Sequence, residues 1–352
     1  MKRTVGVMMG GDSREREVSR ASGVAVARAL SARGHRVTLL DTEHGVVPVP
    51  SGGGPGPGPT PPRASDAVGS APDRLIRWVE LLRDAEVVFP ALHGGWGEDG
   101  TIQAVLELAG IPCAGSGVAA SALAMDKERS KRIFRDAGIP TPPGGALTVH
   151  PGTPPDAEEL ARAAAAAGSP DLVVKPAREG STVGLTLVKD GQGLADAVTR
   201  AGLCGDRVLV ERFIPGRELT VGVLEGRALP VVEIVPEGGL YTYEAKYTGG
   251  KSEYLAPAPL GSDEAGKLAQ AGERAFAALG CEGFGRADFR LSPDGGIWCL
   301  EVNTLPGMTG LSLVPMAAAA DGISFEELVE RIVEDAIRRA GQTPSATTGG
   351  GV

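Results

Sequence analysis

Short apolar runs alternate with helical repeats of apolar residues along the first part of the chain. Residues 4–9 form an apolar run that ends in a glycine turn, and apolar side chains then recur at helical spacing from about residue 15 to residue 32. Gly34 closes this helical pattern, and a second apolar run follows at residues 37–40. The order strand, helix, strand is the unit from which parallel sheets are built, so we expect a parallel sheet at the N-terminus.

Helix and strand patterns continue through the rest of the sequence, and strand patterns become more frequent after residue 210. Helices are predicted at residues 73–84, 119–137, 156–167 and 263–279, and strands at residues 86–92, 172–175 and 185–189. Residues from about 211 onward are rich in strand patterns and include a hairpin. The last helix begins at Ser324, where Glu327 completes an S-x-x-E capping box.

Three domains are expected from this pattern, an α/β domain at residues 1–115 and two α+β parts at residues 116–210 and 211–340. A Pro/Gly-rich segment at residues 48–62 has no periodicity and few side chains that could enter a core. We interpret this segment as a disordered insertion within the first domain. Residues 341–352 are expected to form a disordered tail.

Composition and charge narrow the class of protein. The 352 residues carry a formal net charge of −9, which argues against a protein that binds the backbone of nucleic acids. No run approaches the roughly 20 apolar residues of a membrane-spanning helix, and the N-terminus lacks the features of a signal peptide. The four cysteines have no metal-finger spacing and are expected to be ordinary buried thiols. We therefore expect a cytoplasmic protein with no nucleic-acid and no membrane partner.

The most informative constellation lies in the predicted hairpin near the end of the chain. Asp294-Gly295 is a strong hairpin signal, and a two-residue turn there places Asp288 directly opposite Glu301. Two carboxylates 4 Å apart repel each other by about 4 kcal/mol at an effective dielectric of about 20, unless a cation compensates. Together with the amide of Asn303 on the same face, these groups suit Mg²⁺, which prefers oxygen ligands. Taken alone, the pattern also fits a solvated face that carries two unconnected acids.

A glycine-rich loop at residues 176–184 separates two predicted strands. Its glycines let the backbone approach a ligand closely, and its N–H groups and the hydroxyls of Ser181 and Thr182 can cradle a phosphate. The loop joins strand to strand, and no G-x-x-x-x-G-K-[ST] segment occurs, which excludes a P-loop nucleotide-binding protein. An ordinary flexible hairpin is the alternative interpretation of this loop.

Seven segments stand out in order along the chain. They are GGDSREREVS at 10–19, LHGGWGEDG at 92–100, MDK at 125–127, VKP at 174–176 with the loop after it, YEAKY at 243–247, GRAD at 285–288 and EVNTLPGMT at 301–309. With these segments the sequence resembles the D-alanine–D-alanine ligases of the ATP-grasp superfamily over nearly its whole length. Three features depart from the family pattern, namely the insertion, Trp96 and Thr182, and they bear on loop conformation rather than on the chemistry.

The resemblance implies a fold and an activity. The N-terminal domain would be Rossmann-like, and a two-part ATP-grasp fold would follow. The glycine-rich loop at residues 176–184 would be a flap in its central subdomain, and the catalytic residues would lie in its C-terminal subdomain. The enzyme would be an ATP-dependent carboxylate–amine ligase (EC 6.3.2.4). ATP would phosphorylate the carboxylate of a first D-alanine, and the amine of a second D-alanine would attack the acyl phosphate. The dipeptide would serve peptidoglycan precursor synthesis. Two Mg²⁺ ions, replaceable by Mn²⁺, and a homodimeric assembly are also implied.

The resemblance also assigns individual residues. ATP would be bound by Lys127, Lys175, Glu179, Gly180, Ser181, Thr182, Glu211, Phe213, Glu218 and Lys246. The amino-acid substrates would be held by Glu15, His93, Arg286, Gly307, Ser312 and Leu313. The metal ligands would be Asp288, Glu301 and Asn303, in agreement with the hairpin argument. The catalytic set would comprise Glu15, Ser181, Tyr247, Arg286 and Gly307.

Three alternatives stay open at this point. The segment GSGVAA at residues 115–120 matches a dinucleotide-binding fingerprint, but the region before it has a helical pattern where that fingerprint needs a strand. A catalytically silent nucleotide-binding protein could keep the same fold. A related ligase could use D-serine, D-lactate or another D-amino acid as its second substrate, although Tyr247 in YEAKY favours the dipeptide-forming subtype by resemblance.

Overall fold

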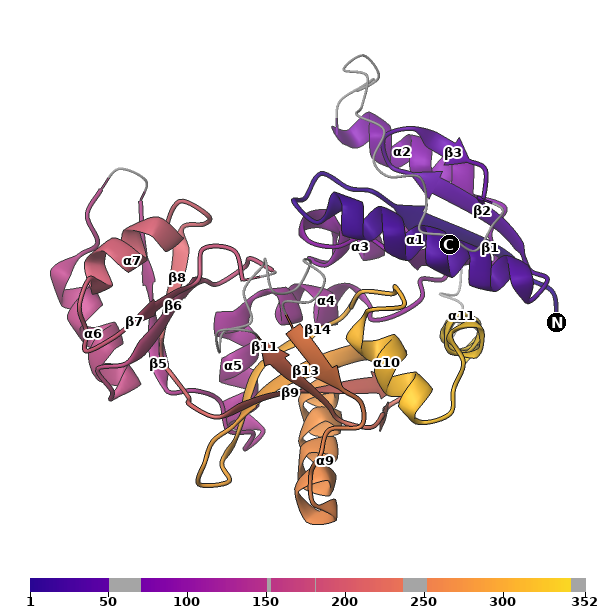
Figure 1. Ribbon diagram of the computed structural model, residues 1–352. Coiled ribbons are helices and arrows are strands. Elements are labelled where there is room, and N and C mark those ends of the chain that lie inside the picture. The colour runs from indigo at the N-terminus through magenta and orange to yellow at the C-terminus, as the bar shows by residue number, and fades with distance from the viewer. Residues whose placement is uncertain (51–70, 151–152, 181, 237–251, 343–352) are drawn as a thin grey trace, which may run out of the picture.

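The computed structural model describes residues 1–50, 71–150, 153–180, 182–236 and 252–342, and it contains three β-sheets with helices packed on them (Figure 1). Most of the predicted insertion and of the predicted tail therefore lies outside the described residues. Ser181, Lys246 and Tyr247 lie outside them as well. Among the described helices, none combines the length and the apolar character that crossing a membrane would require.

The first sheet is the parallel sheet that the N-terminal pattern predicts. In the order β3-β2-β1-β4, β1 is parallel to both neighbours and β3 is an antiparallel edge strand. Its strands are β1 (Thr4–Met9), β2 (Arg36–Asp41), β3 (Gly45–Val47) and β4 (Val87–Pro90), and its helices are α1 (Arg16–Ala32), α2 (Ala71–Leu82) and α3 (Thr101–Leu108), with a 3-10 turn η1 (Gly95–Gly97) before α3. Val7 packs in the cluster that holds α1, whereas Met8 packs with α2 and α3. Because helices cover both faces, β1 is a continuous apolar run.

The second sheet is antiparallel, in the order β5-β8-β6-β7. It comprises β5 (Gly144–Thr148), β6 (Leu172–Pro176), β7 (Thr186–Val188) and β8 (Arg207–Arg212), with α6 (Ala157–Ala167) and α7 (Leu194–Ala201). Alternation along the strands decides which side chains meet the helices, since Val174 and Val210 belong to the apolar cluster with α6 and α7. The neighbours Lys175 and Glu211 consequently point from the opposite face.

The third sheet carries the predicted hairpin and is also antiparallel. Its order is β12-β11-β9-β13-β14, with β10 paired to β9. It comprises β9 (Arg217–Leu224), β10 (Arg227–Ala228), β11 (Val232–Pro236), β12 (Ser252–Leu255), β13 (Phe284–Leu291) and β14 (Ile297–Asn303), with α4 (Val118–Met125), α5 (Lys127–Asp136), α9 (Ser262–Ala278) and α10 (Leu313–Ala320). Ala287 and Phe289 pack in the cluster that holds α4, α5 and α9. Asp288 and Arg290 therefore lie on the other face.

The last helix, α11 (Phe325–Gln342), packs against α1, β4 and α10, so one apolar cluster joins the first sheet to the third. The Ser324 side chain accepts a hydrogen bond from the Glu327 backbone N–H at 3.2 Å, as expected for the start of this helix. The predicted fold class, a parallel α/β unit followed by antiparallel α+β parts, is confirmed. The proposed domain boundaries stay predictions.

The hairpin between β13 and β14 confirms one prediction and corrects another. Asp288 does lie opposite Glu301, but the turn is not the predicted two-residue one, because Leu291 pairs with Ile297 and the loop covers residues 292–296. The register shifts by one residue between Asp288 and Phe289, where Leu300 is the extra residue on β14. Without this bulge Glu301 would point to the apolar face. The bulge, and not the turn, brings the two carboxylates together.

The predicted helix at residues 119–137 is also corrected, since it is two helices. Asp126 has an extended backbone (φ −91°, ψ 94°) and separates α4 from α5. Its side chain accepts a hydrogen bond from the backbone N–H of Arg129 at 3.1 Å, which is a helix N-cap. An aspartate that caps a new helix interrupts an otherwise continuous helical pattern. The break makes Lys127 the first residue of α5.

We predict that Gly216, in the turn between β8 and β9, cannot be replaced by alanine without a large loss of stability. Its φ is +120°, and a Cβ there would lie 2.1 Å from the Leu291 carbonyl oxygen. Gly226 also has positive φ (+77°), but a Cβ there would meet no atom within 4 Å. In urea unfolding, Gly226→Ala should cost about 1 kcal/mol, for backbone strain alone, and Gly216→Ala about 3 kcal/mol or more. Equal losses would show that the contact with Leu291 does not matter.

Candidate active site

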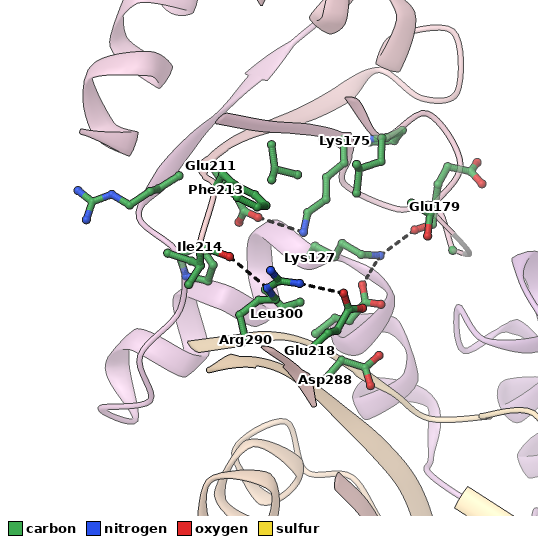
Figure 2. A pocket seen from close by; sticks show the side chains of 18 of the residues that line it. Lys127, Lys175, Glu179, Glu211, Phe213, Ile214, Glu218, Asp288, Arg290 and Leu300 are labelled. Atoms are coloured by element: carbon green, nitrogen blue, oxygen red, sulfur yellow. Dashed lines mark hydrogen bonds and ion pairs between the residues drawn. The ribbon is translucent and has the colours of Figure 1, made fainter. Parts of the chain in front are cut away.

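A pocket opens between the second and third sheets, and side chains from both sheets and from α5 point into it (Figure 2). Its charged and aromatic lining residues are Lys127, Lys175, Glu179, Glu211, Arg212, Phe213, Glu218, Asp288, Arg290 and Glu301. Gly180 and Thr182 of the glycine-rich loop also line it. Thus the described residues of the predicted ATP set are together in one pocket, although they come from distant parts of the sequence.

Two lysines in this pocket are paired with carboxylates from neighbouring elements. Lys127 Nζ lies 3.2 Å from Glu301 Oε2 and donates a 2.7 Å hydrogen bond to the Glu179 carbonyl. Lys175 Nζ lies 3.0 Å from Glu211 Oε2. Burial lowers the pKa of Lys175, but the attraction of Glu211 and Glu301 outweighs burial and leaves that pKa raised. Both lysines lie at the pocket wall, where nucleotide phosphates could replace their carboxylate partners.

Glu211 is buried between two lysines, one of which sequence analysis missed. Lys131 Nζ lies 2.7 Å from Glu211 Oε1, the oxygen that Lys175 does not contact. Burial by itself would raise the pKa of Glu211, but the two ammonium groups lower it below its usual value. Lys131 stands four residues after Lys127 on α5, and this helical spacing places both lysines on one face. That spacing was the signal that could have revealed Lys131.

Arg290 contacts the turn that carries Phe213 and also Glu218 at the start of β9. Sequence analysis missed Arg290 as well. Its guanidinium donates to the carbonyls of Ile214 (3.1 Å) and Gly216 (2.8 Å) and pairs with Glu218 Oε2 at 3.1 Å. It also lies 5.7 Å from the centre of the Phe213 ring. Arg286, Asp288 and Arg290 alternate along β13, so their shared face could have been inferred from the strand period.

The predicted metal ligands lie side by side, with Asp288 and Glu301 lining this pocket and Asn303 lining the neighbouring one. Asp288 receives hydrogen bonds from Arg286 (2.8 and 3.0 Å), from Thr220 (2.6 Å) and from Asn303 (3.0 Å). Glu301, opposite Asp288, pairs with Lys127. Arg286 and Lys127 thus compensate the two carboxylates, so charge repulsion alone does not require a metal ion. The donor set of two carboxylates and one amide still fits Mg²⁺, because each group can supply the oxygen ligand that this ion prefers.

A second pocket adjoins the first one, and Gly180 and Glu301 line both. It holds the whole predicted substrate set, Glu15, His93, Arg286, Gly307, Ser312 and Leu313. Glu15 lies at the start of α1, and a Cβ added at Gly180 would come within 3.2 Å of its Oε2, so the flap approaches this carboxylate closely. The pocket therefore connects the N-terminal unit with the flap and the third sheet.

His93 is buried in the wall of the second pocket. Its Nδ1 lies 3.1 Å from the Leu305 carbonyl oxygen, so this nitrogen carries the proton, and its Nε2 lies 3.0 Å from Ser22 Oγ. The Ser22 hydroxyl also accepts a hydrogen bond from the Met308 N–H at 3.1 Å, and it can therefore donate to Nε2. Burial lowers the pKa of His93, which keeps the imidazole neutral.

Glu98 is a further acid in the second pocket that the sequence predictions did not include. Its Oε2 accepts a 2.6 Å hydrogen bond from the Gly94 N–H. Burial and the nearby charge of Glu15 raise the pKa of Glu98 to about 8. At neutral pH Glu98 is therefore mostly protonated and adds little negative charge to attract an ammonium group. Glu98 lies within the LHGGWGEDG segment, which was a usable signal.

The end of the second pocket is formed by the turn that precedes α10. The Ser312 hydroxyl accepts a hydrogen bond from the Thr309 N–H at 2.9 Å and lies close to Gly307, where an added Cβ would be 2.8 Å from it. Leu313 is the first residue of α10, so its N–H group belongs to a helix N-terminus. Such a terminus favours a carboxylate.

Comparison with known proteins agrees with this fold and site. Residues 4–116 match the family described as D-ala D-ala ligase N-terminus, and residues 133–334 match the D-ala D-ala ligase C-terminus. The D-alanine–D-alanine ligase of Synechococcus sp. (strain JA-3-3Ab) is 44% identical over 346 residues, which cover 97% of this chain and 96% of the relative. Two antiparallel sheets around a pocket of paired lysines and acids define an ATP-dependent ligase of the ATP-grasp class. The chain belongs to the D-alanine–D-alanine ligase family.

Solved structures support the same assignment. The D-alanine–D-alanine ligase of Bacillus anthracis, complexed with ATP, superposes with a TM-score of 0.76 at 28% identity, covering 96% of this chain and 99% of that one. A D-Ala:D-Ser ligase from Enterococcus faecalis gives a TM-score of 0.75 at 28% identity, covering 96% and 100%. The fold is therefore shared by ligases with different second substrates.

We predict that Arg290→Met weakens ATP binding at least tenfold. The substitution removes the partner of Glu218 and two hydrogen bonds to the turn that carries Phe213, and a hydrogen bond involving a charged group contributes about 1.5–3 kcal/mol. Arg274→Met is the matched control, since Arg274 on α9 also donates to a backbone carbonyl, that of Ala137 at 2.7 Å, but lies outside both pockets. Calorimetric titration with ATP would measure both variants. A similar loss in the two variants would remove Arg290 from the nucleotide site.

Proposed function

We propose that this chain joins two D-alanine molecules at the expense of ATP, for peptidoglycan precursor synthesis. The observation that carries the proposal is the contact between the two pockets, one lined by lysines and the other by Glu15 and Arg286, with Gly180 and Glu301 common to both. A phosphoryl group can pass from nucleotide to amino acid only where the two binding sites meet.

The first pocket is proposed to bind ATP. Lys127 and Lys175 would exchange their carboxylate partners for phosphate oxygens, and cations over a transferring phosphoryl group are what phosphoryl transfer requires. Phe213 would pack near the base, and Glu211 and Glu218 would accept hydrogen bonds from the adenine and the ribose. Glu179, Gly180 and Thr182 would cover the phosphates from the flap. Ser181 and Lys246 are proposed for the same site on the resemblance alone.

The second pocket is proposed to bind the amino acids. Glu15 would hold the ammonium of the first D-alanine, with neutral His93 as a fixed hydrogen-bonding wall beside it. Arg286 and the Gly307 N–H would stabilise the oxyanion that develops when the second amine attacks the acyl phosphate. Ser312 and the Leu313 N–H would receive the carboxylate of the second D-alanine. Tyr247 is proposed, by resemblance, to close the site and exclude water from the acyl phosphate.

Asp288, Glu301 and Asn303 are proposed to hold Mg²⁺, with a second ion and the use of Mn²⁺ as a substitute proposed by resemblance. When bound, the metal would neutralise charge on the phosphates of ATP. Asp288 would then exchange its contact with Arg286 for the metal, which frees the guanidinium to face the reacting carboxylate. The homodimer and the cytoplasmic location stay predictions. The dinucleotide-binding alternative gains no support, since the residues just before 115–120 make a single parallel bridge, Cys113 with Val88, and not the strand that the fingerprint needs.

The proposed activity predicts that phosphate is released from ATP in the presence of Mg²⁺ when D-alanine is the sole amino acid. D-serine, D-lactate and L-alanine would be compared as second substrates beside D-alanine, and the products identified by mass. We expect the D-alanine dipeptide to dominate. If ATP binds but no D-substrate releases phosphate, the chain is a silent nucleotide-binding protein. If a mixed product dominates, the chain is instead a ligase that uses another second substrate.

The metal assignment predicts that Asp288→Asn raises the Mg²⁺ concentration for half-maximal rate at least tenfold, because a neutral amide is a much weaker ligand than a carboxylate. Asp294→Asn is the matched control, since Asp294 lies in the turn of the same hairpin, outside both pockets. The rate would be measured over a Mg²⁺ titration at saturating ATP and D-alanine. If Asp288→Asn leaves the half-maximal concentration unchanged, Asp288 is not a metal ligand.

A further inference from the structure

Lys131 lies behind the nucleotide pocket rather than in its wall. Its side chain comes from α5, is 2% exposed, and is absent from the residues that line the pocket, whereas its partner Glu211 and the next lysine, Lys175, do line it. Lys131 therefore acts on the pocket through its neighbours, namely Glu211, which it contacts, and Lys175, whose charge repels its own.

Glu211 is contacted on both carboxylate oxygens before any nucleotide binds. Lys131 Nζ lies 2.7 Å from Oε1, and Lys175 Nζ lies 3.0 Å from Oε2. Glu211 is 3% exposed, so water cannot replace a departing lysine easily. If Lys175 were its sole counter-ion, moving Lys175 toward a phosphate would leave a buried carboxylate without a partner, which is strongly unfavourable.

We infer that Lys131 is a positioning residue, a second counter-ion of Glu211 that allows Lys175 to turn from Glu211 to the phosphates of ATP. The two lysines come from different elements, Lys175 from β6 and Lys131 from α5. When Lys175 leaves, Glu211 keeps one charged partner and exposes Oε2 to the ligand. The same carboxylate can then accept a hydrogen bond from the base. This inference rests on the proposed function only in taking ATP as the ligand.

The test is a double-mutant cycle on ATP affinity, measured by calorimetry without turnover. Lys131→Met should raise the dissociation constant for ATP at least tenfold, because Glu211 then retains Lys175. In a Glu211→Gln background the ion pair that retains Lys175 is already lost, so adding Lys131→Met should change the dissociation constant less than threefold. Arg135→Met, on the exposed side of the same helix, is the control and should bind ATP like the unmodified chain.

Kinetics separate positioning from general damage to the fold. Lys131→Met should raise KM for ATP while kcat and KM for D-alanine change less than threefold. A tenfold loss of ATP affinity that persists in the Glu211→Gln background would overturn the inference, as would unchanged affinity in Lys131→Met alone. If Lys131→Met does not fold, the double variant, which has no unpaired buried carboxylate, still decides when compared with Glu211→Gln. Failure of the ligase reaction would leave these affinities measurable.

Discussion

Strand β13 is hydrogen-bonded to β9 on one side and to β14 on the other, and this pairing sets the position of the charged groups at the centre of the molecule. On β9, Thr220 lies beside Asp288 and Glu218 beside Arg290. On β14, the bulge at Leu300 turns Glu301 to the same face as Asp288. Since the opposite face of β13 is packed against α9, a slip of one residue would drive these charges into the apolar cluster. The packing of one face therefore fixes the chemistry of the other.

Acids in the nucleotide pocket are neutralised by cations from other elements. Lys127 on α5 pairs with Glu301 on β14, and Lys175 on β6 and Lys131 on α5 pair with Glu211 on β8. Removing one partner of a buried ion pair typically costs about 3–5 kcal/mol. These contacts therefore help to fix the positions of the second sheet, α5 and the third sheet relative to one another. The attraction of Glu211 and Glu301 also leaves the pKa of Lys175 raised in spite of its burial. Under the proposed function, nucleotide binding would exchange these carboxylate partners for phosphates.

Much of the candidate site was predictable because its residue types stand in compact segments. Asp288, Glu301 and Asn303 were selected from strand period and charge repulsion, and they do lie side by side. The predicted two-residue turn was nevertheless wrong, because an Asp-Gly pair is compatible with longer loops and a bulge leaves no mark in the sequence pattern. The prediction of one helix at residues 119–137 was wrong because aspartate also occurs inside helices. Whether Asp126 caps a new helix depends on the local backbone. Lys131 and Arg290 could have been inferred from periodicity, but they were missed because neither lies in one of the family segments.

The sequence by itself determined the fold class, the parallel first sheet, the strand–loop–strand flap and the residue types of a phosphate and metal site, because each depends on local periodicity and composition. Only the tertiary structure decided which groups face one another. The partners of Glu211 lie on two other elements, His93 is held between Ser22 and the Leu305 carbonyl, and Arg286 pairs with Asp288. Such contacts depend on distances between segments far apart in the chain, and burial then sets whether each group is charged.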